Sequence, residues 1–272
     1  MVIIQSKNIN GEIYMLKKIF GILLLFLLGV VMIVFSLNGV KTRHKSNFIG
    51  NKVVKESIYN LTAESYSLVI STITMKGSCP SVNIDANAGS KPELVVFTDE
   101  NILECLKVDI DENRHEIKIG CDKDITPSKF DVKISAPMKE FVGRGSFNLN
   151  VSQNNIPEFT SNVSGAISGN YLLKNVQSVS STVYGSGKLK FSGSATNFEI
   201  KIDGSGEINA LDFNVDNFTA NGAGAGKIDA FVNSTADLKL DGAWKFNYKG
   251  NPVNINNDNK NGCKVNRIKQ KK

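Results

Sequence analysis

Four carboxylates in the C-terminal half of the sequence are the first residues to test for chemistry. Asp203, Asp216, Asp229 and Asp241 recur through a Gly-rich region. A glycosidase needs two carboxyl groups about 5–9.5 Å apart in a cleft. An active site interrupts a repeat, whereas these aspartates recur with it, which is typical of turns and solvated faces. We therefore predict no catalytic residue among them.

Other residue types that often carry catalysis are also poorly placed. His44 lies in a polar stretch and His115 in a turn between two strand-like segments, so neither has the setting of a general base. Ser186 and Ser205 stand between glycines, but the Gly-x-Ser-x-Gly elbow followed by a helix is absent. Phosphate-binding loops and the GGxGxD calcium repeat are absent as well. The sequence predicts no enzyme, no cofactor and no metal site.

Cysteine chemistry remains as an option, because four cysteines allow three disulfide pairings. They are Cys79, Cys105, Cys121 and Cys263. Cys105 and Cys121 begin and end a predicted β-hairpin of two alternating segments around a polar turn. Cross-strand neighbours have Cβ atoms about 4.5–5.5 Å apart, which is near disulfide geometry. This pair is our disulfide candidate, with two buried free thiols as the alternative, and no cysteine spacing is typical of zinc.

A repeat of about twenty residues must position most of these side chains. Glycines at 143, 165, 185, 204, 224 and 242 give intervals of 22, 20, 19, 20 and 18 residues. Such a period predicts stacked coils of two short strands and two turns. A tight turn needs positive φ, which glycine adopts without a Cβ clash. We therefore predict one repeated corner of the coil, formed by the glycine pairs Gly185/Gly187, Gly204/Gly206 and Gly224/Gly226.

Apolar residues recur in step with these glycines and predict two inner walls. One wall is the column Leu189, Ile208, Ile228 and Phe246, and the opposite wall is supplied by Phe198, Ile200, Ile202, Phe218, Ala220, Leu238 and Leu240. Lys188, Glu207 and Lys227 occupy equivalent positions between the corner and the core. If the coils stack in register about 4.8 Å apart, opposite charges alternate along this charge ladder; three unrelated surface charges are the alternative.

Three aromatic residues alternate on the last coil. Trp244, Phe246 and Tyr248 therefore share one face. They are a candidate surface for contact with a glycan. The alternative is a hydrophobic cap that closes the end of the core, since the ends of a stacked repeat must be covered.

The segment before the repeat is predicted to form strands, and the body of the chain is mildly acidic. Residues 58–142 alternate apolar and polar positions between Gly, Pro and Asp-rich turns, and "DENILECL" is the one helical turn that we expect. Residues 56–255 hold 18 basic and 24 acidic residues, so the overall charge of +6 comes from the two ends. Nucleic acid is therefore not an expected partner.

The N-terminal part carries a membrane signal. Residues 19–37 contain no charge and nearly span a hydrocarbon core about 30 Å thick, after the pair Lys17–Lys18. We expect an uncleaved signal anchor with the C-terminal part outside the cytoplasm; a cleaved signal peptide and secretion is the alternative. Three basic residues after the span, Lys41, Arg43 and Lys45, favour the opposite orientation. We nevertheless expect the C-terminal part outside the cytoplasm, because the rest of the sequence resembles an exported protein.

Several motifs together resemble a known bacterial family. They are the corners "GSGKL", "GSGEI" and "GAGKI", the ending "YKGNPVNI" and the preamble "DENIL". The sequence, over roughly residues 60–255, is similar to the autotransporter-adhesin head domain called the GIN domain, a domain of unknown function. The resemblance implies a right-handed parallel β-helix-like solenoid, an envelope location and a role in adhesion. It implies no catalytic residue.

These observations predict an all-β protein displayed on a membrane anchor. The expected segments are 1–18 (short N-terminal segment), 19–37 (transmembrane helix), 38–57 (basic linker), 58–142 (β-rich half), 143–255 (Gly-x-Gly solenoid half) and 256–272 (basic tail). The expected function is non-catalytic adhesion or envelope scaffolding in the cell membrane, with a glycan or a cell-surface protein as ligand and a homo-oligomer as a further option. The alternatives are a β-helix carbohydrate-active enzyme and a periplasmic sensor head.

Overall fold

The computed structural model describes one compact unit, Ser46–Lys272, in most of its residues. The described residues are 47–62, 65–75, 81–87, 91–258 and 262–268. The predicted anchor 19–37 and Cys79 lie outside them. Within the described ranges, no helix is long and apolar enough to cross a membrane.

The fold is all-β, as predicted, and is built on one twelve-stranded sheet. The predicted helical turn is α2 (Glu100–Leu103). The strands of the N-terminal half are β1 (Asn47–Ile49), β2 (Val54–Asn60), β3 (Tyr66–Met75), β4 (Val82–Asn87), β5 (Glu93–Asp99), β6 (Leu106–Asp111), β7 (Glu116–Thr126) and β8 (Phe130–Ile134). Their period-2 burial, as in β4 and β8, follows the alternation of apolar residues in the sequence.

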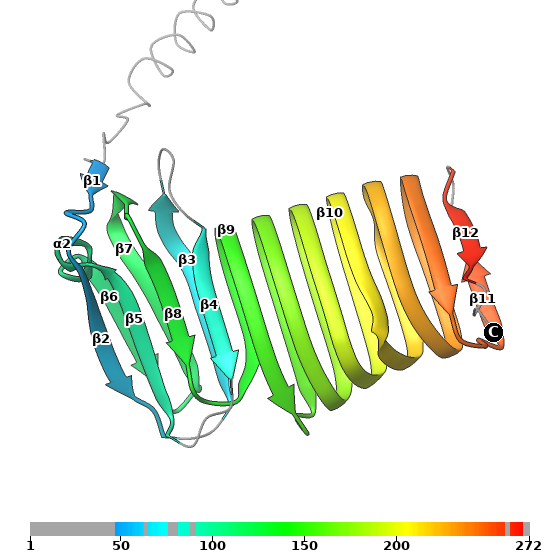
Figure 1. The fold of residues 1–272 in the computed structure, drawn as a ribbon, viewed down its shortest axis with the longest axis horizontal. Coiled ribbons are helices and arrows are strands. Elements are labelled where there is room, and N and C mark those ends of the chain that lie inside the picture. The colour runs from blue at the N-terminus through cyan, green and yellow to red at the C-terminus, as the bar shows by residue number, and fades with distance from the viewer. Residues whose placement is uncertain (1–46, 63–64, 76–80, 88–90, 259–261, 269–272) are drawn as a thin grey trace, which may run out of the picture. The chain divides into compact units, whose positions relative to one another are not determined.

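Two sets of paired strands, which we call the two strand walls, meet at β9 (Met138–Asn154). The first part of β9 pairs with β3, which pairs with β7, and the second part pairs with β4, which pairs with β8; all of these pairs are parallel. Antiparallel strands β5 and then β2 follow β8, and antiparallel β6 lies along the first part of β7, whereas the end of β7 pairs in parallel with β1. The N-terminal half is therefore one end of a parallel stack, closed by antiparallel strands (Figure 1).

The second half continues this stack in β10 (Glu158–Lys249), which runs for 92 residues without a break. β10 pairs in parallel with β9 at a constant offset of twenty residues, from Thr160↔Glu140 to Lys174↔Asn154. Successive stretches of β10, which we call rungs, lie side by side in a row that ends at β11 (Asn254–Asn257) and β12 (Lys264–Arg267) (Figure 1). The period read from the glycines is thus the offset between neighbouring rungs.

At one position of each predicted corner, direct backbone contact between rungs allows only glycine. A Cβ built on Gly185 would lie 2.2 Å from the carbonyl oxygen of Gly165, on Gly204 2.0 Å from that of Gly185, and on Gly224 1.9 Å from that of Gly204. These three glycines and Gly165 all have φ between +127° and +138°. Only glycine combines this backbone conformation with so close an approach.

The prediction that Gly143 begins this column is wrong. Gly145 has the positive φ of +136°, and a Cβ on Gly165 would lie 2.1 Å from its carbonyl oxygen. A Cβ on Gly143 would instead meet the rings of Phe147 and Phe141 at 2.6 and 2.8 Å, so this glycine faces the interior. The two glycines of "GRGSF" are two residues apart, and the spacing in the sequence does not show which of them turns the chain.

Both predicted inner walls are buried. Each member of the column Leu189, Ile208, Ile228 and Phe246 is at most 1% exposed, and so is each residue of the opposite wall. Aromatic rings run through this interior, with Tyr171 stacked on Phe191 at 4.5 Å between centroids. The core is therefore a continuous apolar column along the rungs.

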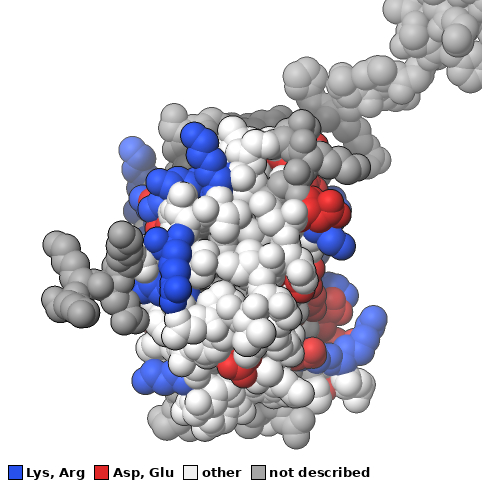
Figure 2. Space-filling view, turned by 90° about the vertical axis from the view of Figure 1, so that its right-hand side faces the viewer, with Lys and Arg blue, Asp and Glu red and all other residues white. Residues whose placement is uncertain are grey.

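Amide side chains line the outside of the rungs. Asn170 donates to Asn150 at 3.0 Å and Asn217 donates to Asn197 at 3.0 Å, each pair being twenty residues apart. Similar bonds continue to the last rung, where Asn256 donates to Asp237 at 2.6 Å. Figure 2 shows Lys and Arg gathered along one side of this end of the molecule, Asp and Glu mixed with Lys and Arg along the other, and few charged residues between.

A buried carboxylate holds the segment between β1 and β2 against the rest of the N-terminal half. Asp99 is fully buried and accepts hydrogen bonds from the backbone N–H of Lys52 (2.7 Å) and from the N–H and hydroxyl of Ser128 (both 2.6 Å). Burial alone would raise the pKa of Asp99, but these donors hold it below the ordinary value of 3.8.

We predict that this carboxylate contributes stability that acid removes. Because the folded pKa lies below the unfolded one, the contribution is complete above pH 3.8 and declines as the pH falls below it. Asp99→Asn places an amide donor among N–H groups and should cost about 1–3 kcal/mol at neutral pH. Urea denaturation of both proteins at several pH values measures this. The difference between them should shrink in acid, and a constant difference contradicts the prediction.

Candidate functional site

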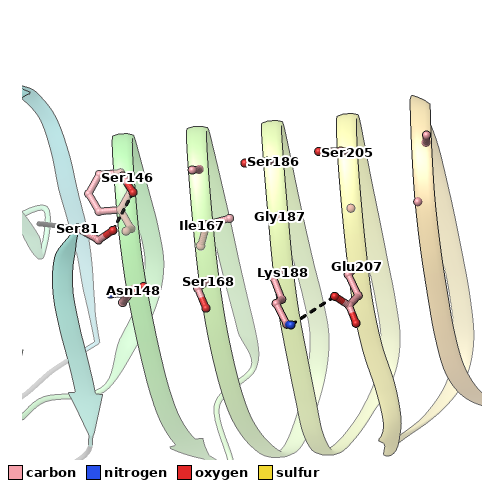
Figure 3. Close-up of a pocket in the computed structure, with 15 residues that line it drawn as sticks. Ser81, Ser146, Asn148, Ile167, Ser168, Ser186, Gly187, Lys188, Ser205 and Glu207 are labelled. Carbon is pink, nitrogen blue, oxygen red and sulfur yellow. Dashed lines mark hydrogen bonds and ion pairs between the residues drawn. The ribbon is translucent and has the colours of Figure 1, made fainter. Parts of the chain in front are cut away.

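A groove lies on the Gly-x-Gly corner. It has a volume of about 530 Å³ and crosses the neighbouring rungs (Figure 3). One side of its lining is the row of residues that follow the corner glycines, namely Ser146, Ala166, Ser186, Ser205 and Ala225. These side chains are small, and this leaves a depression along the stack. We call it the corner groove.

The two glycines of each corner play different parts in this groove. The first, such as Gly204, turns the chain at positive φ, whereas the second, such as Gly206, has no positive φ. Gly187, Gly206 and Gly226 stand where earlier rungs carry Phe147 and Ile167. A Cβ on Gly206 would lie 2.7 Å from Ile202 Cδ1 and 3.2 Å from the ring of Trp244. Gly206, and likewise Gly226 with Trp244 at 2.7 Å, therefore makes room for the core beneath the groove.

Polar groups mark the ends and rim of the corner groove. The hydroxyls of Ser81 and Ser146 lie 2.8 Å apart at one end (Figure 3). Lys188 Nζ lies 3.4 Å from Glu207 Oε2 at the rim. The groove thus offers hydroxyl groups over an apolar floor, and its ammonium and carboxylate groups neutralise each other.

The predicted charge ladder is present only in its first step. Lys188 and Glu207 pair across neighbouring rungs, but Lys227 Nζ lies 2.5 Å from Asp229 Oδ2 on its own rung. Asp229 is 8% exposed and also accepts a hydrogen bond from Asn247 at 2.6 Å, so it holds the ammonium more firmly than an exposed glutamate could.

We predict that Glu207→Lys lowers stability slightly. The two side chains of the pair are 74% and 62% exposed, and exposed pairs contribute about 0.5 kcal/mol or less. The loss should shrink as salt is added, because exposed charges are screened. Thermal denaturation at low and high salt measures both effects. An unchanged melting temperature at low salt contradicts any stabilising role of the pair.

The aromatic residues of the last rung are not a surface platform. Trp244 is 2% exposed and Phe246 is fully buried, while Tyr248 is half-buried. The rings of Phe218 and Phe246 stack at 5.5 Å and those of Phe246 and Tyr248 at 6.0 Å. Trp244 occupies the space that the second corner glycines leave. A ligand on the surface can therefore reach Tyr248 and not the other two.

Cys105 and Cys121 lie together, as their spacing predicts. Their Sγ atoms are 2.7 Å apart across the hairpin of β6 and β7, and both residues are free cysteines in the structure. Burial, followed by the contact with Cys121, raises the pKa of Cys105 to about 12. The Cys105 thiol is thus protonated and unreactive as a nucleophile at neutral pH, but the two sulfur atoms are close enough for oxidation to join them.

We predict that Cys105 and Cys121 form a disulfide when the protein is oxidised. The bond would close a loop of 16 residues, which in the chain-entropy model is worth about 3 kcal/mol. Peptide mass mapping without reduction should find the two cysteine peptides linked, and reduction should lower the midpoint of denaturation. Cys105→Ser/Cys121→Ser is the matched control, since reduction should leave its stability unchanged. Two separate thiol peptides from the oxidised protein would contradict the bond.

The remaining candidate residues do not converge. Asp203 and Asp241 directly precede corner glycines, whereas Asp229 follows one by five residues and Asp216 lies elsewhere on the rung. The expectation that these aspartates recur in step with the repeat is therefore wrong, because only Asp203 and Asp241 occupy equivalent positions. Within the described part of the chain, no three His, Cys, Asp or Glu side chains are grouped to hold a metal ion.

A polar cluster in the N-terminal half escaped the sequence analysis. Glu112 accepts hydrogen bonds from the hydroxyls of Thr62 and Tyr66, both at 2.5 Å, and these bonds lower its pKa. His115, at φ +50° in the turn, packs edge-on against Tyr66 at 5.8 Å. The residues come from two segments fifty positions apart, so no local pattern could reveal the cluster. It fastens the β6–β7 turn to the start of β3.

A second groove lies away from the corner glycines and is more polar. Its volume is about 420 Å³, and its lining includes Asn175, Gln177, Thr196, Asn214 and Asp216. Asn233 spans the last two, donating to Asn214 at 2.8 Å and to Asp216 at 3.2 Å. Because these polar groups already bond to one another, this groove is less available to a ligand than the corner groove.

The fold and the corner groove define a class of protein: an all-β head domain with a stacked, groove-bearing surface. The family model described as "Putative auto-transporter adhesin, head GIN domain" matches residues 71–252. The chain belongs to this family, which confirms the resemblance seen in the sequence motifs. No curated protein matches the chain.

Several solved structures share this fold. A putative adhesin from Bacteroides fragilis is similar at a TM-score of 0.64 and 15% identity, covering 81% of this chain and all of the other. A putative lipid binding protein from Parabacteroides distasonis has a TM-score of 0.60 and 19% identity, covering 82% and 100%. A putative adhesin from Parabacteroides merdae has a TM-score of 0.56 and 17% identity, covering 82% and 99%. These proteins share the fold with this chain.

Proposed function

We propose that this chain is a non-catalytic, membrane-anchored protein of the cell envelope whose β head mediates adhesion or scaffolding. Its family and the names of the similar structures, adhesins and a lipid binding protein, support a binding role. The uncharged segment 19–37 supports the anchor, with the head in the periplasm or outside the cell.

We further propose that the rungs wind as a right-handed parallel β-helix-like solenoid. Two observations support this winding: the constant twenty-residue offset between β9 and β10, and the column of corner glycines in backbone contact. A solenoid presents equivalent positions about 4.8 Å apart along a straight line. Such a surface suits an extended ligand that repeats the same weak contact many times.

The corner groove is the observation that carries the binding proposal. A cavity of about 530 Å³ with an apolar floor and a row of serine hydroxyls has the mixed character of a ligand site. A glycan chain fits these features, because its sugar rings have apolar faces and its hydroxyls can bond to Ser186 and Ser205. The ligand would lie along the stack of rungs.

The test is a glycan array probed with the full chain in nanodiscs. Ser186→Trp/Ser205→Trp fills the groove and should reduce any positive signal at least tenfold. Ser178→Trp is the matched control, since Ser178 is exposed and lies outside the grooves described above. Equal binding by the filled variant and the control would overturn the groove as the site. A chain that cleaves an arrayed glycan would favour the alternative of a carbohydrate-active enzyme.

A further inference from the structure

Exposed apolar side chains are concentrated at one end of the head. Seven large apolar residues are exposed among the described residues, and four of them lie between positions 49 and 58. They are Ile49 (65% exposed), Val53 (49%), Val54 (43%) and Ile58 (55%). We call these four residues the entry face. Single exposed apolar residues are ordinary, but a group within ten residues marks an interaction surface.

The entry face follows from the position of β2 in the sheet. β2 is the last strand of its strand wall and pairs with β5 on one side. Alternation along the strand puts Val54 and Ile58 on the same face as Glu56, and all three are exposed. β1 and β2 both lie at the end of the row opposite β12 (Figure 1). An edge strand in water normally carries polar residues at such positions.

The backbone around the entry face is held in place. Asp99 accepts from Lys52 N, Glu100 N donates to the carbonyl of Val53 at 2.8 Å, and Gly50 N donates to that of Thr126 at 2.9 Å. These bonds keep the residues between β1 and β2 folded against α2 and β7. The exposure of Ile49 and Val53 is therefore built into the fold.

Charge and chain position identify what covers this face. Residues 38–55 contain five Lys or Arg residues and no acidic residue. Of the two described lysines in this range, Lys52 and Lys55, the second pairs with Glu100. The proposed anchor ends at residue 37, only ten positions before β1 begins at Asn47. Ten extended residues span about 35 Å at most, so the entry face stays within reach of the bilayer.

We infer that the entry face rests on an anionic phospholipid surface beside the anchor. The apolar side chains would enter the interfacial layer, while Lys52 would contact phosphate groups. The polar backbone of β2 would remain at the level of the headgroups, where water is present. This inference depends on the proposed anchoring of residues 19–37 and adds the orientation of the head on the membrane.

Tryptophan quenching can test the contact directly, because the chain has a single tryptophan. Trp244 is 2% exposed in the core and should be unaffected by lipid. Ile58→Trp places a second tryptophan in the entry face. Val253→Trp is the matched control, since Val253 is 83% exposed and directly precedes β11 at the far end. The full-length variants are reconstituted into vesicles of phosphatidylcholine and phosphatidylglycerol, with acyl chains brominated near the carbonyl end.

The expected result is strong quenching of Ile58→Trp, at least half of the added fluorescence, and none of Val253→Trp. Vesicles without phosphatidylglycerol should quench less, because Lys52 then lacks an anionic partner. Equal fluorescence of Ile58→Trp with and without bromine would overturn the inference. If that unquenched fluorescence is also blue-shifted and the chains cross-link, a second copy covers the face instead.

Extraction with alkaline carbonate separates this inference from the proposed anchor. A chain that resists extraction but is not quenched at position 58 keeps the anchor and overturns the entry face as a lipid contact. A chain that is extracted refutes the anchor, and the inference fails with it. Resistance together with quenching supports both.

Discussion

Gly224→Ala is expected to destabilise the head by about 4 kcal/mol or more, enough to threaten folding. Two costs combine at this position. The backbone has φ +127°, which L-residues rarely adopt, and the new Cβ would lie 1.9 Å from the carbonyl oxygen of Gly204. That oxygen belongs to the backbone of the rung below and cannot rotate away. The rungs would have to separate, and the core between them would be exposed.

Gly187→Ala is the matched control for this prediction. Gly187 belongs to the same kind of corner, has no positive φ, and its Cβ would meet Val183 at an ordinary distance of 3.4 Å. We expect a change of less than about 1 kcal/mol, because alanine in a strand interior restricts the unfolded chain more than glycine. Urea denaturation of both variants makes the comparison. Similar stabilities would show that rung contact at the first glycine does not limit the fold.

Trp244→Ala should cost about 3–5 kcal/mol, as removal of a large buried aromatic side chain does. The indole is 2% exposed and lies against Gly206 and Gly226, at 3.2 and 2.7 Å from the Cβ positions that these glycines lack. No neighbouring side chain at those positions can fill the space. The cavity would open beneath the corner groove.

The control for Trp244 is an aromatic residue on the surface. Tyr184 is 48% exposed, so Tyr184→Ala should cost about 1 kcal/mol or less. The native fluorescence of Trp244 should be blue-shifted and should move to the red on unfolding, because the ring leaves an apolar core. A Trp244→Ala variant that is stable but no longer binds ligand would contradict this prediction and would indicate that Trp244 contacts the ligand.

Local patterns allowed many features of this chain to be predicted correctly. The all-β fold follows from period-2 alternation, and the twenty-residue offset follows from the recurrence of glycine before aliphatic residues. The helical turn at Glu100–Leu103 and the contact of Cys105 with Cys121 are also local, since each depends on residues close in sequence. The family motifs "GSGKL" and "GSGEI" occur at the same corners, and the family model confirms them.

Other features depend on which residues the fold brings together. The choice between Gly143 and Gly145 depends on the rung beneath, and the partner of Lys227 depends on the burial of Asp229. Trp244 alternates like a surface residue, but the missing side chains of Gly206 and Gly226 open a space that draws it inside. The corner groove is likewise a property of several rungs at once.

The sequence by itself determined the strand pattern, the period of the stack and the inward columns, because each can be read from the spacing of residue types along the chain. Tertiary structure alone decided the groove, the buried place of Trp244 and the exposed entry face. These arise from contacts between segments twenty or more residues apart. Their free energies depend on what each rung meets on its neighbour.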